Sequence, residues 1–213
     1  MFQILVGIAE VISSAVSLVA SIVKTVGIEL VQFARMLTEL AKGLGLMEPE
    51  SDVIELGDKG IQAEEMGITP DKFEEYDDYL RAVKDFEVDK DKSVSISEDD
   101  KLKKGAELVT AVLISKYGDL AATFLWLCAK MPSYFEPRMP YLTTTPKDSD
   151  SPAFVGITRY LEGKETDFDK NLEAEKMLTE IDKTVEPDIT DSKIEEQRRA
   201  LEAIIAMGQK EVE

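Results

Sequence analysis

The stretch from residue 89 to residue 100 holds the residue types that could do chemistry. Its sequence is Asp-Lys-Asp-Lys-Ser-Val-Ser-Ile-Ser-Glu-Asp-Asp, so a carboxylate or hydroxyl oxygen recurs at almost every second position. Calcium is bound in proteins by oxygen ligands that a short loop presents at such intervals. The candidate ligands are the side chains of Asp89, Asp91, Ser93, Ser97 and Asp100 and the main-chain carbonyl of Ser95.

This stretch resembles the calcium loop of the EF-hand family, which lies between two helices. Ile96 matches the apolar eighth position of that loop. Val94 departs from it, because the family has a glycine there and a left-handed turn is costly for a β-branched residue. Asp100 replaces the bidentate glutamate and is one methylene shorter. The alternative interpretation is a solvated loop that ends at Ser97 in a helix cap.

The remaining residues offer little support for catalysis. The chain has no histidine, which removes the commonest general base and the usual zinc ligand. Cys128 lies in the apolar run 120–129 and is predicted to be a buried small hydrophobe. Ser21 and Lys24 have the spacing of a serine–lysine acyl-transfer motif, but no companion motif follows, and polar residues on an outer helix face explain that spacing better. We therefore predict that the protein is not an enzyme and has no cofactor.

Composition limits the partners. The 213 residues suffice for one sizeable domain, or for a domain with an appendage. Residues 1–47 carry three basic and three acidic residues, so the whole net charge of −18 falls on residues 48–213. An acidic body repels the phosphates of nucleic acids and the headgroups of anionic lipids. We expect no nucleic-acid partner.

The N-terminal segment 1–47 is apolar around most of a helix. It contains no proline, and its polar residues recur mostly three, four or seven positions apart, which traces a narrow stripe along one side of a helix. The pattern predicts one long helix or two tandem helices that end at Gly43 and Gly45, before Pro49. The stripe consists of Gln3, Glu10, Ser14, Ser17, Ser21, Lys24, Gln32, Arg35, Glu39 and Lys42.

A continuous helix of this length needs something to cover it. Residues 2–46 would form a rod about 67 Å long, whereas a compact chain of this size is about 44 Å across. Monomers seldom expose large apolar surfaces. The segment is therefore expected to fold back at Gly27, to enter a bilayer, or to pack against copies of itself. Residues 2–23 carry one charge and are long enough to span a membrane, but Glu10 and the lack of a preceding basic residue do not fit a cleavable signal peptide.

An apolar repeat of seven residues runs through this segment. Its stripe is wider than the seam of a dimeric coiled coil, which favours a higher-order bundle. The alternative is the central helix of a monomeric bundle. The residues expected to make the oligomer contacts are Leu5, Ile8, Ile12, Ala15, Val16, Val19, Ile22, Val23, Val26, Leu30, Phe33, Leu37 and Leu40.

The segment 48–213 is predicted to be an acidic, all-α domain. Neither a strand nor an internal repeat is indicated by the periodicity. A charged loop is expected at 85–97, a hinge at 117–119 and an irregular region at 132–151. The expected helices are 51–66, 70–84, 98–116, 120–131, 152–161, 167–184 and 190–212.

These features favour a non-enzymatic structural subunit of a homo-oligomeric assembly, with segment 1–47 as its bundle-forming element. Such a subunit suits a phage or mobile-element particle, or a secretion or conjugation machine, where it would also contact other subunits. Deleting residues 1–47 is then expected to leave a soluble monomer. The alternative is a membrane-anchored or pore-forming protein with residues 2–23 in lipid; a third hypothesis is a calcium-regulated binding module. We expect synthesis in the cytoplasm and incorporation into a particle or a membrane-associated complex.

Overall fold

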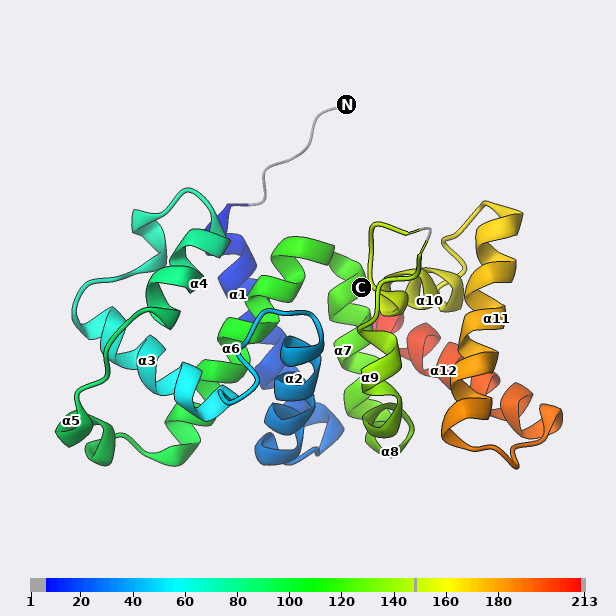
Figure 1. Cartoon of the computed structure of the whole chain (residues 1–213), viewed down its shortest axis with the longest axis horizontal. Coiled ribbons are helices and arrows are strands. Elements are labelled where there is room, and N and C mark those ends of the chain that lie inside the picture. Colours follow the sequence, from blue (N-terminus) through cyan, green and yellow to red (C-terminus); the bar gives the residue numbers. More distant parts are fainter. Residues whose placement is uncertain (1–6, 148, 212–213) are drawn as a thin grey trace. The chain divides into compact units, whose positions relative to one another are not determined.

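The chain is helical throughout the part that the structure describes. The structure is a computed structural model that describes residues 7–147 and 149–211, with side chains up to residue 207. Every regular element in these ranges is a helix (Figure 1), so the all-α prediction is confirmed. The chain divides into two compact units, Met1–Gly118 and Asp119–Glu213, called here the first and the second unit. The sequence placed a boundary after residue 47 instead, because it could not indicate that the N-terminal helices pack within the first unit.

The N-terminal segment is two helices in tandem. Helix α1 spans Ile8–Ser21 and continues into a short π-helix, η1, at Ile22–Val26; α2 spans Leu30–Gly43. Gly27 separates them with a φ of 70°, a left-handed conformation that glycine adopts without steric cost. Of the alternatives that the sequence left open, the structure has two tandem helices with a break at Gly27, and the single long rod is wrong.

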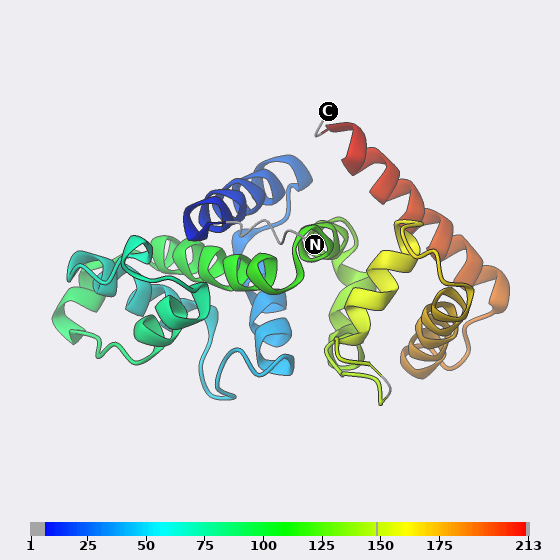
Figure 2. The ribbon, with the colours of Figure 1, turned by 90° about the horizontal axis from the view of Figure 1, so that it is seen from above.

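Helix α6 (Glu98–Tyr117) is the central element of the first unit. Helices α1, α2, α3 and α4 all contact it, and α1 lies along the side of α6 away from α3 (Figure 2). Residues 108–113 of α6 are buried without interruption, which requires cover on every face of a helix. The other elements of this unit are α3 (Val53–Glu65), η2 (Pro70–Lys72), α4 (Tyr76–Lys84) and α5 (Lys90–Ser95).

Helices α3 and α6 touch backbone to backbone. A Cβ atom added to Gly57 would lie 1.8 Å from the main-chain oxygen of Lys101, and one added to Gly105 would lie 1.8 Å from the main-chain oxygen of Val53. Atoms cannot approach so closely, so any side chain at either glycine would force the two helices apart. The two glycines therefore set the distance between α3 and α6.

The large apolar side chains of α3 do not all lie on its inward side. Val53 is buried, but Ile54 and Ile61 are half-buried and Met66 is 68% exposed. The inward side is centred instead on small residues such as Gly57, because close helix contact favours small side chains over large ones.

Two local predictions between residues 70 and 97 were wrong. The segment 70–84 is not one helix, since Phe73 and Glu75 have extended backbone angles between η2 and α4. The expected loop contains helix α5, which begins after Asp89. The cap at Ser97 is confirmed, because its hydroxyl oxygen accepts a hydrogen bond of 3.1 Å from the main-chain N–H of Asp100.

The second unit packs around α7 (Asp119–Lys130), which follows a break at Gly118, where a hinge was expected. The ring of Phe124 on α7 lies 4.6 Å from that of Phe154 and 5.6 Å from that of Phe135. The region 132–151, expected to be irregular, contains three short helices. The other elements are α8 (Pro132–Phe135), η3 (Glu136–Arg138), α9 (Met139–Leu142), α10 (Ala153–Leu161), α11 (Phe168–Val185) and α12 (Asp191–Glu211).

Candidate interaction surface

One side of α1 packs on its own unit and the other faces outward. Val11, Ala15, Val19 and Ile22 are buried, and their spacing of four, four and three residues places them on a single helix face. The exposed residues on the opposite side form what we call the outer face of α1. It consists of Glu10, Ser13, Ser14, Ser17, Ala20, Ser21 and Lys24.

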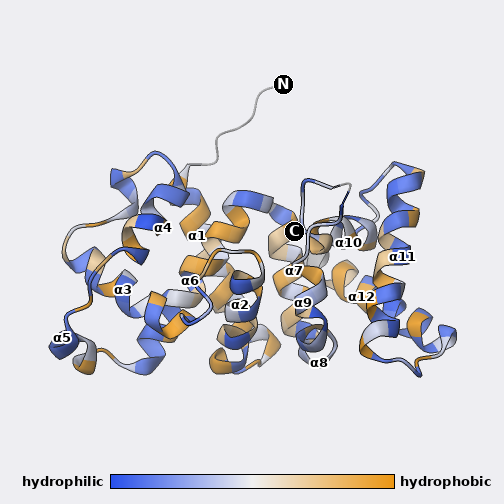
Figure 3. Cartoon of the chain, in the orientation of Figure 1, coloured by the Kyte–Doolittle hydropathy of each residue, from blue (hydrophilic) through white to orange (hydrophobic). Residues whose placement is uncertain are grey.

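This outer face is poor in charge. Within Ile8–Val26 the charged residues are Glu10 and Lys24, whereas a helix face in contact with water normally carries several. Helix α11 of the same chain has a face with several charged residues. Figure 3 shows α11 as mainly hydrophilic and α1 as mainly hydrophobic. The exposed charges of α11 are Asp169, Lys170, Glu173, Glu175, Lys176, Glu180 and Lys183.

Apolar side chains flank the outer face. Val16 is 37% exposed, and Ile12, Leu18 and Val23 are half-buried. The segment Ile8–Val26 is long and apolar enough to cross a membrane, and 22% of that stretch is buried. A core helix or a signal sequence has the same length and composition, so this property alone is weak evidence for a membrane. The low burial indicates a side of the helix, made mainly of small residues, that the described part of its own unit does not cover.

The residues predicted to make oligomer contacts fall into two groups. Ala15, Val19, Ile22, Phe33, Leu37 and Leu40 are buried within the first unit. Ile8, Ile12, Val23, Val26 and Leu30 are half-buried and Val16 is exposed; Leu5 lies outside the described residues. The periodicity of the sequence does not distinguish the two groups. It indicates that a helix face is apolar, but it does not indicate which molecule covers that face.

The calcium-loop candidate has a different backbone from the loop that the resemblance implied. Asp91 and Ser93 lie within helix α5, and the Asp89 carboxylate caps that helix by accepting a 2.9 Å hydrogen bond from the N–H of Asp91. The Ser97 hydroxyl donates to the Asp100 carboxylate, 2.6 Å away, at the start of α6. Within residues 7–147 and 149–211, no group of three or more Asp, Glu, His or Cys side chains is placed to hold a metal ion.

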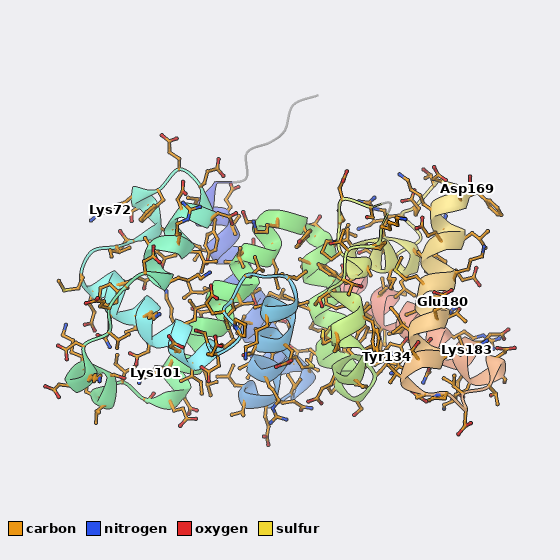
Figure 4. All side chains as sticks on the ribbon, viewed as in Figure 1. Lys72, Lys101, Tyr134, Asp169, Glu180 and Lys183 are labelled. Atoms are coloured by element: carbon orange, nitrogen blue, oxygen red, sulfur yellow. The ribbon has the colours of Figure 1, made fainter. Side chains whose placement is uncertain are left out.

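A polar cluster attaches α5 to α3 and α6. The Lys101 Nζ atom lies 2.9 Å from Asp58 Oδ2 and donates to Ser93 Oγ, 2.8 Å away; Figure 4 labels Lys101 in this part of the first unit. The Ser93 hydroxyl donates to the same Asp58 carboxylate. Lys101 and Ser93 are thus both bound to one carboxylate on α3. The cluster therefore suits a structural role better than a catalytic one.

Asp58 should make stability depend on pH. Burial opposes its ionisation, but hydrogen bonds from Ser93, Lys101 and Gln62 and the charge of Lys101 outweigh burial, so the pKa of Asp58 is lowered. A lowered folded-state pKa gives stability that is present above about pH 4 and is lost as the pH falls through the folded-state pKa. We expect the destabilisation caused by Asp58→Asn, measured by urea denaturation, to be clear at pH 6 and to shrink at pH 3. An equal difference at both pH values would contradict this assignment.

A second buried cluster joins η3 to α11 in the second unit. Arg138 is 1% exposed and Asp182 is fully buried. The Arg138 Nε donates to Asp182 Oδ1 at 2.8 Å, and the Tyr134 hydroxyl donates to the same oxygen at 2.9 Å. The guanidinium also stacks 3.9 Å from the centre of the Tyr134 ring, which Figure 4 labels. Burial, followed by the charge of Asp182, raises the pKa of Tyr134 well above its usual value.

This cluster was not predicted from the sequence. Asp182 shares the inward side of α11 with Leu178 and Ile181, and a carboxylate at a core position of the helical pattern is the signal that could have found it. Cys128 was predicted correctly as a buried residue, and burial raises the pKa of its thiol.

Comparisons of this chain with protein-family models, with curated proteins and with solved structures find no match. The fold and the surface define the class: an all-helical protein with an apolar N-terminal helix whose exposed side is poor in charge and made mainly of small residues.

Proposed function

We propose that this protein is a non-enzymatic structural subunit that associates with copies of itself through the outer face of α1 and its apolar flanks. One observation carries the proposal. The most apolar segment of the described chain lies on the surface of the first unit with 22% of its length buried, although the chain as a whole carries a net charge of −18. Large uncovered apolar surfaces are typical of interaction sites.

Covering apolar surface favours association by about 25 cal/mol per Å² removed from water, and that gain has to exceed the entropy lost on association. A stable interface covers about 800 Å² on each partner, more than one short helix presents.

A large assembly is the setting that this architecture suits. Particles of phages or mobile elements and secretion or conjugation machines are built from helical subunits that repeat, and this step from architecture to setting is an analogy. The ion pair of Lys101 with Asp58 and the hydrogen bond of Ser93 to the same carboxylate support a structural role for this serine and lysine.

A membrane-associated role is the second candidate, and one observation favours it. Ile8–Val26 has 19 residues and few charges, and a helix of about 20 apolar residues spans a bilayer. In that case the serines of the outer face would line a pore or contact neighbouring helices. Flotation with liposomes separates the candidates, because a self-associating soluble subunit stays in solution without detergent.

Light scattering with surface substitutions tests the proposal. Deletion of residues 1–47 would also uncover α6, so point substitutions are the cleaner choice. We expect the wild-type chain to be oligomeric without detergent and Val16→Glu to shift it toward the monomer by at least tenfold in Kd, because a buried carboxylate is costly at an apolar contact. The control is Val94→Glu, since Val94 is 89% exposed on α5.

The outcome can contradict the proposal in two ways. A wild-type chain that is monomeric at all accessible concentrations would exclude self-association. An oligomer that Val16→Glu and Val94→Glu affect equally would place the contact elsewhere on the molecule. Circular dichroism of both variants establishes that their fold is intact.

A further inference from the structure

We infer that residues 86–96, called here the strap, open away from the first unit while the rest of that unit stays folded. The strap contains α5, connects α4 to α6 and lies at the edge of the unit (Figure 1). In its closed state it covers a polar patch that consists of Asp58, Gln62 and Lys101. Opening exposes this patch and does not require the self-association proposed above.

The strap contributes no residue to the core. Every residue from 84 to 101 is half-buried or exposed, whereas Val83 before this stretch and Leu102 after it are buried. Val94, the one apolar residue of α5, is 89% exposed. A helix of six residues is not stable by itself, so α5 depends on its contacts with other helices. A segment with few buried apolar contacts opens at a lower cost than the core of its unit.

Polar contacts hold the strap closed at two points. The Gln62 carboxamide on α3 accepts a 2.9 Å hydrogen bond from the main-chain N–H of Asp89 and donates a 3.3 Å bond to the main-chain oxygen of the same residue. About one helical turn further on, the Ser93 hydroxyl donates to the Asp58 carboxylate and accepts a 2.8 Å bond from Lys101 Nζ. Together these contacts form a latch that fixes both the position and the rotation of α5.

The patch keeps contacts of its own when the strap opens. Lys101 Nζ lies 2.9 Å from Asp58 Oδ2, and Gln62 Nε2 donates to Asp58 Oδ1 at 2.8 Å. Neither contact involves the strap. Removing one partner of a buried ion pair is costly because it leaves a charge unpaired, but the Asp58 carboxylate stays paired with Lys101 in the open state. The strap can therefore leave without creating an isolated buried charge.

The core of the first unit is complete without the strap. Helices α3 and α6 touch directly at Gly57 and Gly105. The Tyr76 hydroxyl at the start of α4 donates a 3.1 Å hydrogen bond to the main-chain oxygen of Leu108 on α6. Helices α4 and α6 thus hold each other and anchor both ends of the strap, whether it is closed or open. Opening is accordingly a local event, and the strap remains tethered at both ends.

Hydrogen exchange followed by NMR tests the inference on the full chain. The reporter is the amide of Asp89, which the Gln62 carboxamide protects, and the reference is the buried stretch 108–113 of α6. We expect the Asp89 amide to exchange at least tenfold faster than the reference and at least tenfold slower than in an unstructured peptide. Its rate should hardly change with urea below the unfolding transition, because a local opening exposes little surface.

Ser93→Ala tests the latch. Alanine favours a helix more than serine does, so exchange would become slower if α5 were held by its own helix alone. Because the substitution removes a hydrogen bond to a charged group, we expect the Asp89 amide to exchange about tenfold faster. The matched control is Ser95→Ala on the same helix. The Ser95 hydroxyl donates to the main-chain oxygen of Lys92, 2.6 Å away, and is not part of the latch, so this variant should show no acceleration.

Three results would overturn the inference. An Asp89 amide that matches the α6 reference in rate and urea dependence would mean that the strap opens only when the whole unit unfolds. Exchange as fast as in an unstructured peptide would mean that the strap is not closed. Equal effects of Ser93→Ala and Ser95→Ala would mean that the Ser93 hydroxyl does not hold the strap.

Discussion

Arg138→Met is expected to lower the free energy of unfolding of the second unit by about 3–5 kcal/mol. Arg138 and Asp182 are 1% and 0% exposed, and the substitution leaves the Asp182 carboxylate buried without a positive charge. Its other oxygen, Oδ2, already has no hydrogen-bond partner among the described residues, so the remaining stabilisation would come from the Tyr134 hydroxyl at 2.9 Å. Few single substitutions cost this much.

Fluorescence reports this unit directly. Trp126 is the only tryptophan of the chain and lies on α7, so its emission during a urea titration follows the second unit. The matched control is Arg159→Met, because Arg159 pairs with Glu165 at 3.6 Å and is 43% exposed. A pair so open to solvent contributes at most about 1 kcal/mol. Equal losses for the two arginine variants would refute the assignment.

A double substitution tests the cause of the loss. Arg138→Met combined with Asp182→Leu removes both charges, and an apolar pair of similar size is often as stable as a buried ion pair. We expect the double variant to be more stable than Arg138→Met alone. A double variant that loses the sum of both single effects would indicate that the arginine acts through packing and not through its charge.

Gly105→Ala is expected to destabilise the first unit by about 3 kcal/mol or more, at the upper end of the cost of overpacking a core. The added Cβ would lie 1.8 Å from the main-chain oxygen of Val53, and a backbone atom cannot move aside as a side-chain end can. Relief requires α3 and α6 to separate along a contact that includes Gly57 on the facing helix. The central packing of the unit would loosen with it.

The control for this prediction is a helical glycine in open space. Gly156 lies in α10, and an added Cβ there would meet no atom within 4 Å. Gly156→Ala should therefore be neutral or stabilising by up to about 1 kcal/mol, through helix propensity alone. Far-ultraviolet circular dichroism during a urea titration follows both units, and the part of the transition that the fluorescence of Trp126 does not share belongs to the first unit. Wild-type stability of Gly105→Ala would exclude backbone contact between α3 and α6.

The predictions for Arg138→Met and Gly105→Ala concern different kinds of contact. Both depend on residues that a pattern of apolar side chains does not reveal. Glycine contributes nothing to an apolar stripe, and a charged residue counts against one. At Gly105 the absent side chain allows two backbones to meet. At Asp182 a charge is acceptable in the core because Arg138 is brought to it from another helix.

Several features of this protein follow from its sequence alone. The helical class, the cap at Ser97 and the break at Gly118 were predicted, and the fold-back at Gly27 was one of three alternatives that the sequence left open. Each depends on a signal within a few residues: a glycine free to take a left-handed turn, a hydroxyl able to accept from a backbone N–H, or a repeat of apolar side chains. Such signals act through the local backbone and need no distant partner.

Only the tertiary structure decided which surfaces meet. The apolar residues of α1 look equivalent in the sequence, yet Val19 is buried on α6 and Val16 is exposed. The segment after Asp89 became helix α5 where a loop was expected, and its Ser93 meets Asp58, thirty-five positions earlier in the chain. Contacts between residues far apart depend on how whole helices pack, and helix packing is set by shape and burial summed over many side chains. No short stretch of sequence contains that information.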